Sequence, residues 1–209
     1  MRYFYGVYPK DRGLRAFLSL IRYVCQPDAI RYAHITVRGP YSRRLPKLQV
    51  LSLNCAIDPL HRMHLGEPDS FFEGTQNTVL LRVDAERLKD VWHKPDYPDS
   101  IAHITLYDGN SRAQALRVLN VVSSYCWDMN ISTSELTVIE PKISDSDGFL
   151  SMTTDLHRAY AKFRLEADLP ELGSVASMDF ADRLAILRSM MEVSGLKKVA
   201  HGCHERIIA

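Results

Sequence analysis

Hydrophobic and polar positions in the first forty residues change spacing twice. Residues 2–8 form a short segment rich in aromatic side chains, which predicts a strand. The turn-forming residues from Pro9 to Asp11 are expected to end it. Apolar residues next recur at the i, i+3, i+4, i+7 spacing of a buried helical face, with Asp11 as the expected N-cap. That face consists of Leu14, Phe17, Leu18, Ile21 and Cys25. A β-branched run from residue 31, ended by Gly39 and Pro40, predicts a second strand.

The middle of the chain has weaker patterns. Residues 48–57 alternate imperfectly between apolar and polar side chains and predict a strand. Residues 61–75 are rich in Gly, Pro, Asp and Glu, which favours a loop or an edge strand, and residues 77–83 predict a buried strand. Asp84 is expected to cap a short helix that ends before Pro95 and Pro98. The expected buried residues of that helix are Leu88, Val91 and Trp92.

One tetrapeptide occurs twice. Ala33-His34-Ile35-Thr36 reappears at residues 102–105, within a predicted strand over residues 100–109. Each copy follows a predicted strand and a predicted helix, and the second is followed by a helix over 111–126 and a strand over 135–140. The duplicated order predicts an α+β domain over residues 1–141, with two lobes related by a pseudo-twofold axis.

The remaining residues predict a helical extension. Residues 141–148 are rich in Ser and Asp and are expected to form a linker. Helical spacing then recurs over 154–166 and 177–193, with Gly195 as the closing residue. We therefore expect an extension over 149–209 that packs on the first domain or on a protein partner.

Composition restricts the classes of partner. The chain has 26 Lys and Arg against 25 Asp and Glu, a formal net charge of +1, so no global positive field favours duplex DNA. The four cysteines lie far apart without a C-x-x-C pair, and the first residues resemble no secretion signal. No apolar stretch approaches the roughly 18 residues of a membrane span. We expect a cytoplasmic protein that is not embedded in a membrane.

The duplicated strands each present a row of polar side chains, because residues two apart on a strand point to the same face. On the first strand the row is His34, Thr36 and Arg38, and on the second it is His103, Thr105 and Tyr107. The residues between them, such as Ile35 and Ile104, are expected in the core. Two imidazoles with an ordinary pKa near 6.5 suit proton transfer in both directions, and hydroxyls can donate to phosphoryl oxygens. This chemistry requires neither a metal nor a cofactor.

The motifs His34-Ile35-Thr36-Val37 and His103-Ile104-Thr105-Leu106 resemble those of the 2H phosphoesterase superfamily. The resemblance covers about residues 1–140. It implies a bilobal fold in which two antiparallel sheets line a central cleft, with helices outside. It further implies that His34 and His103 are the acid/base pair and that Thr36 and Thr105 bind phosphate. Implied substrates are 2′,3′-cyclic phosphates, 2′-5′-linked oligonucleotides, RNA ends or cyclic nucleotides.

Other candidate residues follow from the same face argument. Arg38 is a candidate phosphate clamp, Tyr107 a candidate for stacking on a base, and Tyr3 and Tyr5 a candidate stacking wall. His61 and His64, and the tail residues His201, Cys203 and His204, lack the second ligand pair that a metal site needs, so no metal is expected. No phosphate-binding loop, dinucleotide fingerprint or serine-esterase motif is present.

The sequence therefore predicts a metal-independent phosphodiesterase that acts on short RNA, an oligonucleotide or a cyclic nucleotide. Two alternatives stay open. One is a module that binds such a ligand in the same cleft without turnover, and the other is an enzyme that joins RNA ends without ATP. The linkage attacked, and which histidine is the acid, are not determined by these patterns.

Overall fold

The computed structural model describes residues 2–28, 31–58, 62–94, 102–139 and 146–199 and has an α+β fold. The strands are β1 (Tyr3–Val7), β2 (Ile35–Tyr41), β3 (Met63–Glu73), β4 (Gln76–Asp84), β5 (His103–Gly109), β6 (Met129–Ile131) and β7 (Thr137–Ile139). The helices are α1 (Arg12–Cys25), α2 (Lys47–Ala56), α3 (Arg112–Val122), α4 (Ser146–Ala167), α5 (Leu172–Val175) and α6 (Phe180–Val193), with one 3₁₀ helix, η1 (Glu86–Val91).

The described strands form one seven-stranded antiparallel sheet in the order β6-β3-β4-β5-β2-β1-β7. The resemblance to 2H phosphoesterases implied two sheets, and the difference lies at the join between β2 and β5. These strands share one pair of residues, Ile35 opposite Ile104. Beyond it, β2 bonds instead to His93, whose backbone N–H donates to Val37 O at 3.1 Å and whose carbonyl accepts from Gly39 N at 3.0 Å. The two halves of the sheet therefore diverge immediately after they meet.

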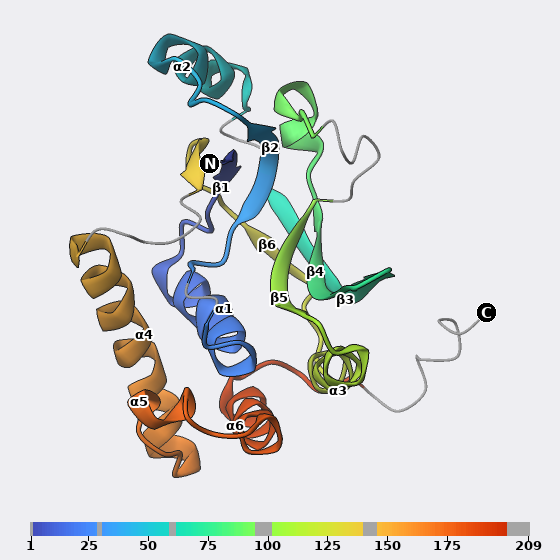
Figure 1. Cartoon of the computed structure of the whole chain (residues 1–209), viewed down its shortest axis with the longest axis vertical. Coiled ribbons are helices and arrows are strands. Elements are labelled where there is room, and N and C mark those ends of the chain that lie inside the picture. The colour runs from blue at the N-terminus through green and yellow to red at the C-terminus, as the bar shows by residue number, and fades with distance from the viewer. Residues whose placement is uncertain (1, 29–30, 59–61, 95–101, 140–145, 200–209) are drawn as a thin grey trace.

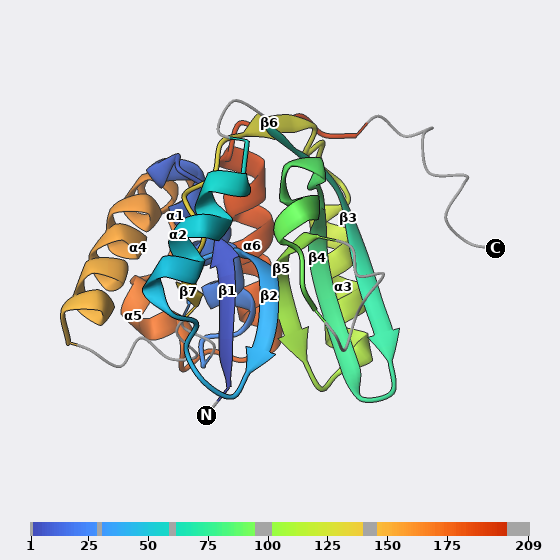
Figure 2. The ribbon, with the colours of Figure 1, turned by 90° about the horizontal axis from the view of Figure 1, so that it is seen from above.

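Helices cover the two faces of the sheet unequally. Helices α1, α3, α4, α5 and α6 lie on one side, and α2 and η1 lie on the other (Figures 1 and 2). The buried isoleucines Ile35 and Ile104 belong to the hydrophobic core, which also contains residues of α1 and α3. The residues that alternate with them on β2 and β5 consequently face the more sparsely covered side of the sheet.

Helix α1 follows its predicted pattern. The Asp11 carboxylate accepts a hydrogen bond from Leu14 N at 2.7 Å, so the expected N-cap is confirmed. Leu18, Ile21 and Cys25 are buried, and Leu14 and Phe17 pack against them. The capped end and the apolar face together fix α1 against β5 and the C-terminal helices.

The predictions for the middle of the chain were partly wrong. Residues 48–57 lie mostly in helix α2, which has no buried residue and leaves Leu48 80% and Leu51 58% exposed. A helix that buries neither face carries no helical periodicity in its sequence, so chance alternation predicted a strand. Residues 61–75 contain the long strand β3, in which Pro68 follows a register shift after Leu65. Such an irregularity accommodates a proline within a paired strand.

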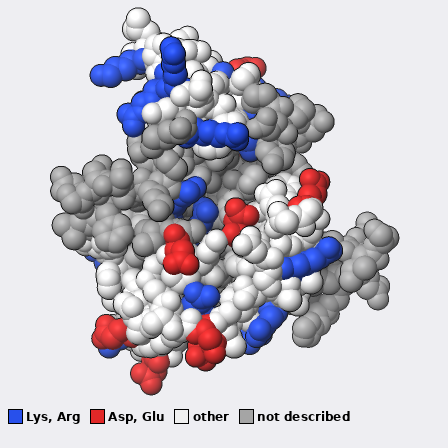
Figure 3. Space-filling model, in the orientation of Figure 1, with Lys and Arg blue, Asp and Glu red and all other residues white. Residues whose placement is uncertain are grey.

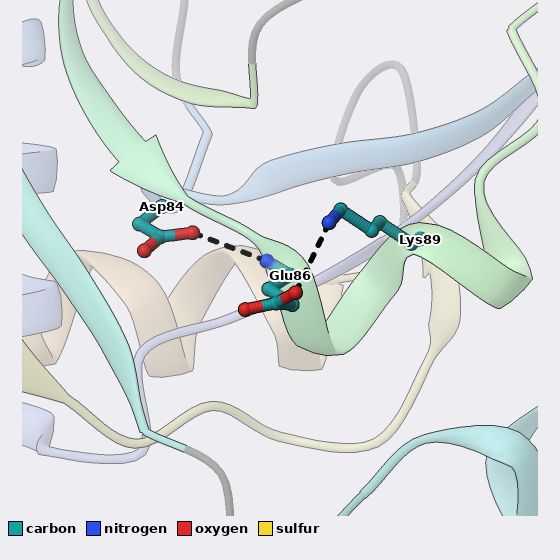
Figure 4. Close-up of polar contacts among 3 residues, drawn as sticks. All are labelled: Asp84, Glu86 and Lys89. Atoms are coloured by element: carbon teal, nitrogen blue, oxygen red, sulfur yellow. Dashed lines mark hydrogen bonds and ion pairs between the residues drawn. The ribbon is translucent and has the colours of Figure 1, made fainter.

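The expected cap of the short helix after β4 was wrong by one residue, because Ala85 is the N-cap of η1 and Asp84 lies just before it. The Asp84 carboxylate accepts from Glu86 N at 3.2 Å, and Lys89 Nζ lies 3.1 Å from Glu86 Oε1 (Figure 4). Leu88 and Val91 are buried beneath these exposed contacts, as predicted, and Trp92 is half-buried. This turn brings His93 beside β2. Pro95 and Pro98 lie outside the described residues.

The C-terminal helices belong to the same core as the sheet. Helix α4 packs on α1, and α6 packs on α1 and α3. The ring of Phe17 on α1 lies 5.4 Å from that of Phe163 on α4 and 6.2 Å from that of Trp127. Of the predicted linker, residues 141–145 lie outside the described residues, and α4 already begins at Ser146. Among the described helices, none combines the length and apolar character that crossing a membrane requires.

Candidate active site

The two repeated motifs lie side by side at the centre of the sheet. Because β2 and β5 are antiparallel and Ile35 pairs with Ile104, His34 and Thr36 flank the paired residue on one side of the join, and His103 and Thr105 flank it on the other. All four polar side chains are half-buried, whereas Ile35 and Ile104 are fully buried. The register therefore groups two imidazoles and two hydroxyls on one face.

Hydrogen bonding fixes the tautomer of His34. Its Nδ1 lies 2.8 Å from the carbonyl oxygen of Tyr32, which can only accept, so Nδ1 carries the proton. Nε2 of the neutral ring then keeps its lone pair. The rings of Tyr8 and His34 make an edge-to-face contact, with centroids 5.9 Å apart. This bond and this contact hold the orientation of the imidazole.

The pKa of His34 is lowered to about 4. Burial is the main cause, because it penalises the charged imidazolium, and the bond to Tyr32 only partly opposes it. Positive charge from Arg22, Arg31 and His103 lowers the pKa further. His34 is consequently neutral at pH 7.

His103 has a different environment. It is half-buried at the start of β5, and its ring meets Phe71 of β3 nearly at right angles, with centroids 5.4 Å apart. Its backbone pairs with Arg82 of β4. Phe71 therefore supports the second imidazole much as Tyr8 supports the first.

Arg38 lies on β2 beyond Thr36 and already has protein partners. Its Nε donates to Tyr41 Oη at 3.1 Å, and a terminal nitrogen donates to Val91 O at 2.6 Å. These bonds direct the guanidinium toward η1, on the same side of the sheet as His34 and Thr36. Its role as a phosphate clamp stays a prediction.

Tyr107 does not share the face of Thr105. The ladder shifts between Val79, which pairs with Tyr107, and Leu80, which pairs with Thr105, so the alternation of β5 is interrupted. Tyr107 is 3% exposed, donates its hydroxyl to Gln114 of α3 at 3.1 Å and contacts Phe180 of α6. Its contacts are those of a core residue, and its proposed stacking on a base stays untested.

Tyr3 and Tyr5 are not equivalent. Tyr5 is 1% exposed, and its hydroxyl accepts from Leu45 N at 2.7 Å, so the ring belongs to the core. Tyr3 is half-buried, and the guanidinium carbon of Arg44 lies 5.5 Å from its ring centroid. Of the two, only Tyr3 presents an accessible aromatic surface.

Within the described ranges, no three His, Cys, Asp or Glu side chains gather as a metal site requires. His64 Nε2 instead lies 3.1 Å from Asp128 Oδ1. His61 and the tail residues His201, Cys203 and His204 lie outside the described residues.

Sequence reasoning missed several residues around the histidines. Arg22 is 7% exposed on the buried face of α1, and its burial and the nearby Arg31 lower its pKa to about 10. Arg22 follows the apolar residue Leu18 by four positions, and this helical spacing was the signal in the sequence that could have placed it on the buried face. Tyr8 and Phe71 have no comparable signal, because their approach to the histidines depends on how strands distant in sequence pair.

The sequence matches no protein-family model. It also matches no curated protein.

Proposed function

We propose that this protein is a metal-independent phosphodiesterase that cleaves a ribose-linked phosphodiester with His34 and His103. The observation that carries the proposal is the pairing of Ile35 with Ile104, which sets the two His-x-Thr rows side by side. A phosphodiester between these rows would meet a base, an acid and two hydroxyl donors together. Such a constellation supplies general acid–base catalysis with stabilisation of the phosphoryl oxygens.

The environment of His34 favours the role of general base. With Nδ1 bonded to Tyr32 O and a pKa of about 4, its free Nε2 accepts a proton at neutral pH. His103 is then the general acid. In hydrolysis of a 2′,3′-cyclic phosphate, His34 takes a proton from water as its oxygen bonds to phosphorus. His103 gives a proton to the ribose oxygen whose bond to phosphorus breaks.

Cleavage of a 2′-5′ linkage would use the same groups. His34 would take the proton of the vicinal 3′-hydroxyl, whose oxygen attacks phosphorus, and His103 would protonate the departing 5′-oxygen. The product is a 2′,3′-cyclic phosphate. In both reactions Thr36 and Thr105 donate to the non-bridging oxygens, where negative charge concentrates as phosphorus becomes five-coordinate.

We further propose that the fold has two lobes. We assign β1, β2 and β7 with α1 to one lobe, and β3 to β6 with α3 to the other, with the division at the single pair between β2 and β5. Among the described residues, the first lobe has α1 between β1 and β2, whereas the second has η1 between β4 and β5. Short RNA, an oligonucleotide or a cyclic nucleotide in the cytoplasm is the proposed substrate, consistent with a net charge of +1.

The test is a substrate panel in EDTA: 2′,3′-cyclic nucleotides, 2′-5′ and 3′-5′ oligonucleotides and cyclic dinucleotides. We expect turnover of at least one member, with kcat/KM rising with pH near the His34 pKa of about 4 as the base loses its proton. His34→Ala and His103→Ala should each lower kcat/KM by about 10²-fold or more.

His157→Ala, at an exposed position of α4, is the matched control. Loss of all activity in EDTA with recovery by a divalent metal would refute metal independence. Ligand binding without turnover, preserved when both His34 and His103 are replaced, would indicate a binding module instead.

A further inference from the structure

A cluster of aromatic and basic side chains continues from Thr36 along β2. Arg38 bonds to Tyr41 at the end of the strand, and Tyr41 Oη lies 3.0 Å from His93 Nδ1. Since Arg38 donates to that phenol oxygen, the phenol can donate its own proton to His93. The planes of the Tyr41 and His93 rings are within 6° of parallel, with centroids 5.8 Å apart. Hydrogen bonds therefore hold two aligned rings next to the proposed catalytic row.

The backbone fixes this pair of rings in place. Bonds from His93 to Val37 and Gly39 attach the segment after η1 to β2, and the edge of Tyr5 packs against Tyr41 with centroids 6.1 Å apart. His93 nevertheless remains exposed, and Tyr41 is half-buried. A rigid and accessible aromatic surface loses little conformational entropy when a flat ligand stacks on it.

Positive charge surrounds these rings. Arg43 and Lys47 are exposed, and Arg44 lies over Tyr3, which pairs with Tyr41 in the sheet. No Asp or Glu occurs from residue 35 to residue 57. In Figure 3, Lys and Arg side chains gather over α2. The net charge of the chain is only +1, so this concentration is local.

We infer that Arg38, Tyr41, His93, Arg43 and Arg44 bind further nucleotides of a single-stranded substrate whose scissile phosphate lies between the His-x-Thr rows. This inference rests on the proposed function and makes the substrate an oligonucleotide. From Thr36 to Tyr41 the strand extends roughly 17 Å at about 3.3 Å per residue, room for several stacked nucleotides at about 3.4 Å each. Aromatic rings between cations are typical of single-strand binding.

The test measures binding of single-stranded RNA of two, four and eight nucleotides by fluorescence anisotropy. The full chain carries His103→Ala to prevent turnover. We expect affinity to increase with length. His93→Ala should weaken binding of the octamer by about 5- to 150-fold, the range for loss of one stacked base. Arg43→Gln with Arg44→Gln should reduce the salt dependence of octamer binding by about 1.4 in log–log slope, for two fewer phosphate contacts.

Arg158→Gln with Lys162→Gln, on α4 in the opposite layer, removes the same charge and should leave binding unchanged. Affinity that does not depend on length, or His93 and Arg43/Arg44 variants that bind as the parent does, would overturn the inference. So would competition by an acidic peptide as effective as the octamer. Turnover of a 2′,3′-cyclic mononucleotide by the wild type, retained in the Arg158→Gln/Lys162→Gln variant with intact His103, tests the proposed function separately.

Discussion

At the scale of single residues, the most consequential feature is a histidine kept neutral by its surroundings. The Tyr32 carbonyl fixes the Nδ1 proton of His34, and burial together with nearby positive charge lowers its pKa to about 4. In the unfolded chain a histidine titrates near pH 6.5. Below that pH the unfolded state binds a proton that folded His34 refuses, so the folded state loses stability as pH falls from about 6.5 to about 4.

Replacing His34 by Gln should remove this contribution. Urea unfolding of the wild type and of His34→Gln at pH 7 and pH 5 measures the difference. We expect the wild type to lose more unfolding free energy than the variant does between these values. The control variant is His157→Gln, which removes an imidazole from an exposed position of α4. An identical pH dependence in His34→Gln and the wild type would show that His34 does not titrate in this way.

At the scale of elements, α1 and α2 illustrate how burial makes a helix recognisable. Helix α1 has a cap at Asp11 and a continuous apolar face, and both appear in its sequence. Helix α2 has no side-chain cap and buries no residue, so its sequence carries neither signal. Its apolar residues Leu48 and Leu51 are therefore exposed.

The cap of α1 should have a measurable effect on stability. Asp11→Ala leaves Leu14 N without its 2.7 Å partner and should lower the free energy of unfolding by about 0.5–2 kcal/mol. Chemical denaturation measures this change. Asp90→Ala removes an exposed carboxylate from η1 and serves as the control. A stability loss in Asp90→Ala as large as that in Asp11→Ala would contradict a specific capping effect.

At the scale of the whole molecule, the C-terminal helices and the sheet share one hydrophobic core. Leu187 of α6 and Leu156 of α4 are buried in the same cluster as Ile35 and Ile104. Helix α1 contacts β5 of that sheet and also α4. The extension is therefore a structural layer behind the strands that carry the proposed site, rather than an appendage, although a protein partner on its outer surface stays a prediction.

A cavity in α6 should consequently destabilise the entire chain. Leu187→Ala removes a fully buried side chain and should cost about 2–5 kcal/mol in a single cooperative transition. Calorimetry or urea unfolding, followed both by circular dichroism and by tryptophan fluorescence, measures it. Leu165→Ala, where the side chain is 86% exposed, is the control. Two separate transitions, with only one shifted by Leu187→Ala, would mean that the extension folds independently.

The sequence by itself determined the elements with a buried face and the residues of the proposed chemistry. Strand alternation placed His34 with Thr36 and His103 with Thr105, because side-chain direction on a strand is a local property. Tertiary structure alone decided that the strands form one sheet, that a register shift moves Tyr107 into the core, and that Tyr8, Phe71 and Arg22 surround the histidines. These features depend on pairing between residues far apart in the chain, which a local pattern does not encode.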